Sequence, residues 1–221
     1  SQITSTFAPT TDIGSSAQPV ALNLVSGKWQ LWSARDIYLQ EVRNPSGMFN
    51  EEYSQPVYNG VSLPAWQVGV PNLFDYAPDA SVKIVAGNSV QLLGTSLPRT
   101  VPTMGPIYPP NLDIESGAGG ITVSRSFTLA PAPLGDLQIT TTSGGSLRGS
   151  LTSPINITMS DSSGADFNTF LNGHGFPPLH LNDPNPVRLT IDGNIENILL
   201  QSPKAAWVDV GGNIENILLQ S

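Results

Sequence analysis

The chain has 221 residues, and its 17 acidic against 9 basic side chains give a formal net charge of −8. Such a surface repels phosphate backbones, so nucleic acid is excluded as the expected partner. The chain has no cysteine, which excludes disulfides, thiolate metal sites and cysteine nucleophiles, and no apolar run approaches the roughly 18 residues of a membrane span. Its 21 glycines and 20 prolines favour short strands and tight turns over helices.

A turn-and-strand head recurs from residue 34 onward. In each copy, small residues, often glycine, precede an Ile, Val or Leu that opens an alternating run. Glycine supplies the positive φ of a sharp turn, and Asn or Asp tolerates it. The residues just before the aliphatic one are Asp36, Ser89, Gly120, Ser146, Asn194 and Asn213.

The spacing of these heads predicts a stacked architecture. The successive gaps are 53, 31, 26, 48 and 19 residues. If the gaps of 53 and 48 hold two coils each, the mean is about 25 residues per coil, within the range of repeat proteins. Strands with apolar residues at every second position are expected at 82–86, 155–159 and 187–191. The sequence therefore predicts an all-β parallel β-helix, or β-solenoid.

The decapeptide GNIENILLQS occurs twice, at 193–202 and again at 212–221. We expect the two copies to be adjacent coils, with Ile195 stacked on Ile214 and the asparagines before them forming an amide ladder. Neither alternating face of the decapeptide is purely polar, which predicts a bulge or corner inside it. The alternative is a duplication without architectural meaning. Because the second copy would leave an unprotected apolar edge, the chain is expected to be a fragment of a longer protein.

Three long stretches interrupt the strand pattern, near 43–80, 95–112 and 161–186. In a single β-helical unit covering 1–221 these stretches are loop insertions, which usually carry function. The stretch 95–112 is too rich in proline for a central strand. An alternative has a β-sandwich domain before a short solenoid, with the boundary near residue 80 or 115.

Charged and histidine side chains give no strong catalytic or metal signature. Asp161 and Asp166 lie in a segment that lacks the oxygen ligands of a calcium loop and is typical of an ordinary turn. His174 and His180, with Asp183 nearby, have no zinc-site spacing, and packing inside a loop is the alternative. No catalytic residue, cofactor or metal site is therefore predicted.

The aromatic residues are the stronger candidates for ligand binding. Exposed aromatic rings in loops suit a carbohydrate-binding face, whereas rings that fold down onto the coils would only anchor the loops. Trp29 and Trp32 share the segment KWQLW, and Phe74 lies in the first insertion. The candidate ligand-binding aromatics are Tyr53, Tyr58, Trp66 and Tyr76.

Four segments carry a resemblance to a known family: ARDIYLQEVRNPSGMFN, DASVKIVAGNSVQLLG, IESGAGGITVSRSFTL and the GNIEN repeats. They resemble the filamentous-haemagglutinin-type exoproteins of bacteria, a two-partner-secretion adhesin family. The resemblance implies a right-handed parallel β-helix, secretion through an outer-membrane transporter, display on the cell surface and an adhesive role. It supplies no catalytic residue.

The sequence thus predicts an extracellular structural or adhesive module, not an enzyme, that displays binding loops on a β-helical stalk. The expected partners are glycans or proteins of host or neighbouring cells, together with further coils of the same parent chain. The alternative is a β-helical polysaccharide-active enzyme or a phage-type depolymerase fibre. Such an enzyme requires a cluster of acidic side chains on one strand face beside a groove.

Overall fold

The structure is a computed structural model that describes residues 11–44, 57–58, 61–62, 76–94, 106–150, 153–163 and 178–220. These residues form strands and turns and contain no helix, so none of them forms a helix that could cross a membrane. Nearly all of the strands belong to two parallel sheets, called sheet A and sheet B below, and β4 (Val57–Tyr58) and β5 (Val61–Ser62) form an antiparallel pair.

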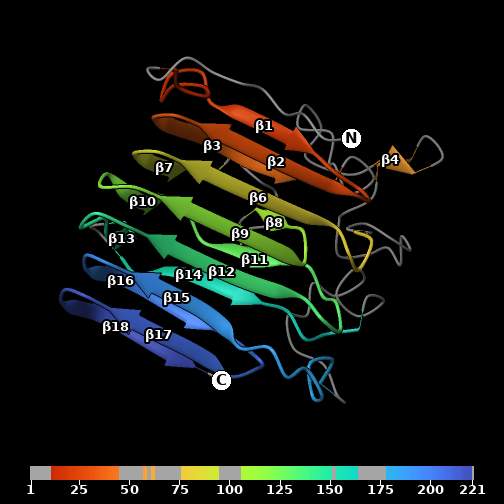
Figure 1. Cartoon of the computed structure of the whole chain (residues 1–221). Helices are drawn as coiled ribbons and strands as arrows, with labels where there is room; N and C mark the ends of the chain where they lie inside the picture. The colour runs from red at the N-terminus through yellow and green to blue at the C-terminus, as the bar shows by residue number, and fades with distance from the viewer. Residues whose placement is uncertain are drawn as a thin grey trace.

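The chain alternates between the two sheets. Each sheet B strand is followed in the sequence by a sheet A strand, and the pairs lie in successive layers from β2–β3 to β17–β18 (Figure 1). Sheet B contains β2 (Lys28–Ser33), β6 (Ser81–Ala86), β9 (Asn111–Ser116), β12 (Asp136–Thr141), β15 (Val187–Ile191) and β17 (Ala206–Val210). Sheet A contains β1 (Val20–Asn23), β3 (Asp36–Arg43), β7 (Ser89–Leu92), β8 (Ile107–Tyr108), β10 (Gly120–Val123), β11 (Phe127–Leu129), β13 (Leu147–Arg148), β14 (Ile155–Met159), β16 (Ile195–Gln201) and β18 (Ile214–Gln220).

All six predicted heads fall in one register of sheet A. Asp36 pairs with Ser89 and Ser89 with Gly120, and the residues that follow the heads continue the ladder across β10, β13, β16 and β18. The expectation of two coils in the gaps of 53 and 48 residues is therefore wrong. Each of these gaps spans one step between adjacent strands, because an insertion lengthens the sequence without adding a strand to this register.

Glycines allow the turns of successive layers to stack closely. A Cβ built on Gly117 would lie 2.1 Å from the carbonyl oxygen of Gly87, and one built on Gly145 would lie 2.2 Å from that of Gly117. Real side chains do not tolerate such distances, so these turns need residues without a Cβ. The glycines of the predicted heads thus serve close backbone approach as well as turn geometry.

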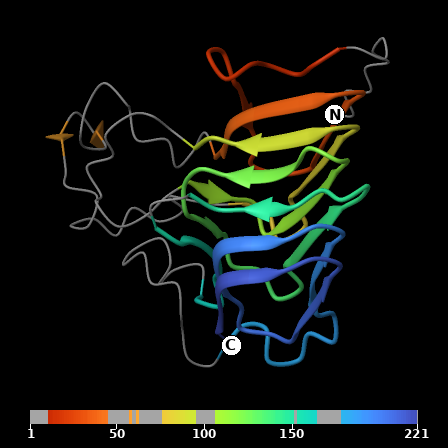
Figure 2. The ribbon, with the colours of Figure 1, turned by 90° about the vertical axis from the view of Figure 1, so that its left-hand side faces the viewer.

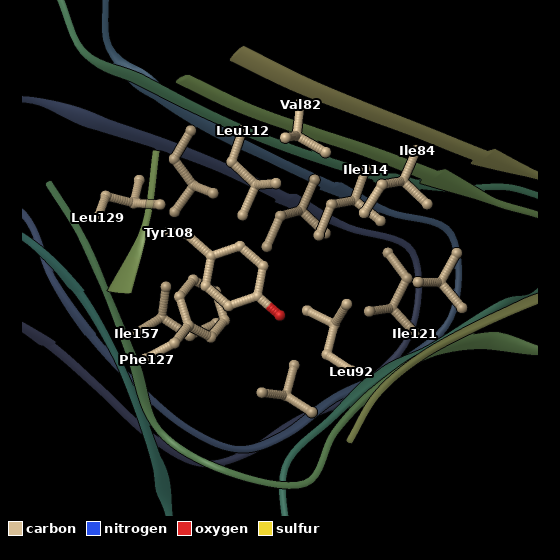
Figure 3. Packing of buried hydrophobic residues seen from close by; sticks show 14 of the residues in the cluster. Val82, Ile84, Leu92, Tyr108, Leu112, Ile114, Ile121, Phe127, Leu129 and Ile157 are labelled. Atoms are coloured by element: carbon tan, nitrogen blue, oxygen red, sulfur yellow. The ribbon is translucent and has the colours of Figure 1, made fainter. Parts of the chain in front are cut away.

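The core lies between the two sheets and consists of aliphatic columns, one residue from each layer (Figure 3). Full burial of each aliphatic side chain contributes about 1.5–3 kcal/mol. Tyr108 and Phe127 fill the space between the sheets with their rings 4.8 Å apart. One column in sheet A contains Ile37, Val90, Ile121, Leu147 and Ile195, and one in sheet B contains Leu31, Ile84, Ile114, Ile139 and Leu189.

The proline-rich stretch 95–112 contains strand residues, contrary to the sequence-based expectation. β8 lies within it, and β9 begins at Asn111 and is a central strand between β6 and β12. The prolines are tolerated because they take part in hydrogen bonds only through their carbonyl groups, which need no amide hydrogen. Pro106 accepts a hydrogen bond from the Thr128 amide, and Pro110 accepts one from the Asp136 amide. Strand pairing continues across residue 115, since β9 pairs with β12.

The two decapeptides are adjacent strands in register, as predicted. Ile195 pairs with Ile214 and Leu199 with Leu218. The expected corner is present, since Asn197 has a φ of 57° and divides β16 into one half that pairs with β13 and another that pairs with β14. Asparagine is among the few side chains that adopt this backbone region readily.

Candidate functional site

The outward-facing side chains of sheet B form a flat surface, called the sheet B face below. Along β2, β6, β9, β12 and β15, buried side chains alternate with exposed or half-buried ones, as expected for a sheet with one side on the core. Strand register places the outward residues in straight rows. The first row is Gln30, Lys83, Asp113, Gln138, Arg188 and Trp207, and the second is Trp32, Val85, Glu115, Thr140, Thr190 and Asp209.

A tryptophan lies at each end of the sheet B face. The residues Trp32 and Trp207 are 57% and 61% exposed, and they come from the first and last strands of sheet B. Five strand-to-strand steps of about 4.8 Å separate these strands, which gives about 24 Å. The Arg188 guanidinium lies 5.9 Å from the centre of the Trp207 ring, within the range of a cation–π interaction.

An ion-pair cluster fixes the polar side chains in the middle of the sheet B face. The Lys83 ammonium donates to Asp113 Oδ2 at 2.7 Å and also to Glu115 Oε1. The hydrogen bond to Asp113, and then that to Glu115, raise the pKa of Lys83 above its usual range despite partial burial. Three side chains from two strands are thereby held in one arrangement, although at this exposure the pairs add little stability.

A hollow of about 530 Å³ continues the sheet B face at the beginnings of three strands. Lys28, Ser81 and Asn111 line it, and each lies two residues before a member of the first row. The side-chain amide of Asn111 donates to the carbonyl oxygen of Ala80 at 3.0 Å, which fixes the orientation of this side chain. The volume lies within the range of small-molecule sites. The remaining lining residues are Pro78, Asp79, Pro133 and Leu134.

The structure places one of the candidate ligand-binding aromatics, Tyr76, in the core. Tyr76 is buried, and its hydroxyl donates to the carbonyl oxygen of Ile107 at 2.9 Å, so it anchors the chain to the core. Tyr76 is therefore not an exposed loop aromatic, and it follows the alternative in which the ring folds down onto the coils. Tyr53 and Trp66 lie outside the described residues, and Tyr58 lies in β4, where only the backbone is described.

Trp207 is the functional candidate that sequence reasoning missed. The signal was present in AWVDV, where Trp207 alternates with Val208 and Val210, which are partly buried and packed against the core. Period-two alternation places the tryptophan on the opposite, solvent-facing side. Trp32 follows the same rule, because it alternates with the buried Leu31 and Ser33.

His180 lies in a buried cluster away from the sheet B face. Its Nδ1 is 3.5 Å from Asp183 Oδ2, and the Lys204 ammonium donates to that same oxygen at 2.8 Å and to the carbonyl oxygen of Gly135 at 2.6 Å. The Lys204 ammonium is thus the positive charge that pairs with the Asp183 carboxylate beside His180. The described residues contain no group of three or more His, Cys, Asp or Glu placed to hold a metal ion. Of the other candidates, Asp161 is buried and Asp166 and His174 lie outside the described residues.

The pKa values of this cluster indicate a neutral imidazole beside an ion pair. Burial, and then the positive charge of Lys204, lower the pKa of His180. Burial raises the pKa of Asp183, but hydrogen bonds from Lys204 and from the Asn185 amide outweigh it, so that the net shift is downward. The cluster therefore holds the segment before β15 against the turn before β12 and the turn before β17.

Comparison with known proteins assigns no family. No family model matches the chain, and no curated protein or solved structure matches it either. The resemblance to filamentous-haemagglutinin-type exoproteins therefore remains a prediction from the sequence.

Proposed function

We propose that the chain is a right-handed parallel β-helix module of a secreted bacterial surface exoprotein, and that its sheet B face binds an extended polysaccharide. Two parallel sheets visited in alternation, with a shared core, support the β-helix. Connections between parallel strands are right-handed in almost all proteins, which supports the handedness. Secretion through an outer-membrane transporter and display on the cell surface rest on the sequence resemblance.

The rows of the sheet B face carry the functional proposal. Aromatic rings offer flat apolar surfaces to sugar rings, and Trp32 and Trp207 offer them at opposite ends of the sheet B face, one in each row. Between them, side chains such as Gln138 and Thr190 supply hydrogen-bonding groups for hydroxyls. A polysaccharide that lies along the stacking direction would contact one strand after another.

Other classes of partner fit the sheet B face less well. A protein interface needs a contiguous apolar centre, but here the tryptophans lie at opposite ends with ion pairs between them. Nucleic acid needs clustered cationic side chains, whereas Lys83 is already paired with Asp113 and Glu115. A neutral or weakly charged glycan requires neither a contiguous apolar centre nor clustered cationic side chains.

One observation bears on the alternative of a polysaccharide-active enzyme. Asp113 and Glu115 point outward from the same strand, which is the pairing of carboxylates that glycoside hydrolysis uses. The Lys83 ammonium donates to both of them, however, and so engages oxygens that a general acid and base need for substrate and water. We therefore favour binding without turnover.

A glycan array tests the proposed function. The intact chain should bind a limited set of extended polysaccharides, and the Trp32→Ala/Trp207→Ala double variant should lose most of that signal. Leu181→Ala is the control, since Leu181 is also a large exposed apolar residue, at 70%, but lies outside the sheet B face. Equal binding by the double variant and the control would contradict the proposal, and release of shorter sugars from a bound glycan would favour the enzyme instead.

A further inference from the structure

Arg188 differs in its surroundings from the other cation in the rows of the sheet B face. The two rows contain two cationic residues, Lys83 and Arg188. Lys83 donates to both Asp113 and Glu115. Arg188 is exposed, and the described residues give its guanidinium no ion pair and no hydrogen bond. Within this part of the chain, its five N–H donors are therefore left for a ligand.

The strand register accounts for this uncompensated charge. β15 lies between β12 and β17, so Arg188 has a row neighbour on each side, Gln138 and Trp207, and neither is an acid. Figure 2 shows the two blue layers that contain β15 and β17 next to each other. The acid of β17, Asp209, lies opposite Thr190 in the second row, and the described residues show no ion pair between it and Arg188. The positive charge of Arg188 thus lies at the surface of a strand that is paired on both edges.

The guanidinium of Arg188 lies beside an exposed aromatic ring. Its central carbon is 5.9 Å from the centre of the Trp207 ring, within range of the π system. Direct contact between carbon atoms needs about 3.5–4.0 Å, so the guanidinium does not stack flat on the ring centre. Trp207 remains 61% exposed. An apolar ring and a fork of hydrogen-bond donors are thus presented together, on two neighbouring strands.

A sugar that carries a carboxylate fits this pair of side chains. The planar guanidinium donates two parallel hydrogen bonds to a carboxylate, and the charges shorten and strengthen them. In a uronic acid the carboxylate is attached to the sugar ring, so the ring can stack on an indole while the carboxylate reaches past its edge. On the basis of the proposed glycan binding by the sheet B face, we propose that Arg188 is a specificity-determining residue, which binds the carboxylate of an acidic sugar stacked on Trp207.

The other charges of the sheet B face limit how many carboxylates the ligand can carry. Three acids of the rows also point outward, Asp113, Glu115 and Asp209. Lys83 compensates the charge of only one of the first two, so a second carboxylate over these strands would meet a negative charge. The chain as a whole carries −8, which repels a polymer with a charge on every residue. The preferred ligand is therefore a polysaccharide in which single uronic acids are separated by neutral sugars.

Monosaccharides test the pairing of Arg188 with Trp207 in the intact chain. The probes are sodium glucuronate, glucose and acetate, and the readout is the indole N–H resonance of Trp207 in NMR, assigned by its loss in Trp207→Phe. Glucuronate should shift this resonance saturably and more than the other two, because glucose lacks the charge and acetate lacks the ring. In Arg188→Gln, glucuronate should shift it no more than glucose does. Absent shifts, or a shift by glucose or acetate as large as that by glucuronate, would overturn the proposal.

A matched pair of polysaccharides tests Arg188 with an extended ligand. One has a single glucuronic acid in each repeat of neutral sugars, and the other is the same polymer with its carboxylates reduced to alcohols. In calorimetry, the acidic form should bind the intact chain about threefold to tenfold more tightly at low salt, and this preference should shrink at high salt. Arg188→Gln should bind both forms equally, and Arg188→Lys should keep part of the preference because lysine has the charge without the fork. Arg148→Gln is the matched control, since it removes the same charge from a side chain of sheet A and should leave the preference unchanged.

The possible outcomes separate this role of Arg188 from glycan binding by the sheet B face. If the intact chain binds both polymers equally and Trp32→Ala/Trp207→Ala loses both, the role of Arg188 is overturned and glycan binding by the sheet B face stands. A preference that Arg148→Gln weakens as much as Arg188→Gln does would also overturn it, because the preference would then reflect net charge alone. Binding of neither polymer, with no shift of the Trp207 resonance by glucuronate, would contradict both proposals.

Discussion

Replacing the first isoleucine of each decapeptide by alanine should lower the free energy of unfolding by unequal amounts. Ile195 is fully buried between Leu147 and Ile214, so Ile195→Ala removes its packing and leaves an enclosed cavity. Such substitutions cost about 2–5 kcal/mol of unfolding free energy. Ile214 is 53% exposed, so it retains about half of the transfer contribution and encloses no cavity. Ile214→Ala should therefore cost about 1 kcal/mol or less.

Equilibrium urea unfolding measures this difference. The midpoint should fall much further for Ile195→Ala than for Ile214→Ala, with an unchanged m-value in both variants, because an altered m-value would report a change in the surface exposed on unfolding. The two alanines stand in identical sequences, so local propensity cancels between them. Equal losses would refute the reasoning, since they would mean that Ile195 does not lie between two apolar layers.

The remaining predictions concern glycine geometry and the buried cluster. Gly120→Ala should lower the free energy of unfolding, measured in urea, more than Gly144→Ala does. Both residues have a positive φ, which costs alanine about 1–2 kcal/mol of strain, but only on Gly120 would a Cβ also lie 2.2 Å from a backbone oxygen, whereas nothing lies within 4 Å of one on Gly144. Equal losses of stability in the two variants would argue against the close approach of the turns. Lys204→Met should lower the free energy of unfolding by about 3–5 kcal/mol, because it leaves the buried Asp183 carboxylate without its ammonium partner. The double variant Lys204→Met/Asp183→Leu should recover part of this stability. A double variant no more stable than Lys204→Met would contradict the pairing. The pKa of His180 lies below its ordinary value of 6.5 in the folded chain, so the unfolded chain binds the proton more readily and stability should fall as pH decreases below about 6.5. His180→Phe should flatten this slope in unfolding curves measured between pH 5 and 8, and an unchanged slope would exclude His180 as its source.

Much of the strand arrangement could be predicted from the sequence, because it depends on local patterns. Period-two alternation identified strands such as 187–191, and the identical decapeptides predicted their pairing and a bulge or corner inside them, which the structure places at Asn197. The number of layers could not be predicted in the same way, because an insertion and an additional layer lengthen the sequence alike. Only the pairing of Asp36 with Ser89 shows that 53 residues make one step.

The candidate site was harder to predict because it depends on contacts between distant residues. The sequence marks Tyr76 as an aromatic in a loop, but the ring is buried in the core and its hydroxyl bonds to Ile107, 31 positions away. In the same way, the Asp183 carboxylate beside His180 is paired with Lys204, which no local pattern connects to it. The rows of the sheet B face require the register of six strands, although the alternation around Trp207 could have shown which way that ring points.

The affinity of the intact chain for oligosaccharides of increasing length tests the central claim most directly. With fragments of a glycan identified on the array, calorimetry should show affinity rising with length until the ligand reaches from Trp32 to Trp207, about 24 Å, and then levelling off. In Trp207→Ala the rise should stop at a shorter length. Affinity that does not depend on length, or a length dependence unchanged by removal of either tryptophan, would contradict binding along the sheet B face.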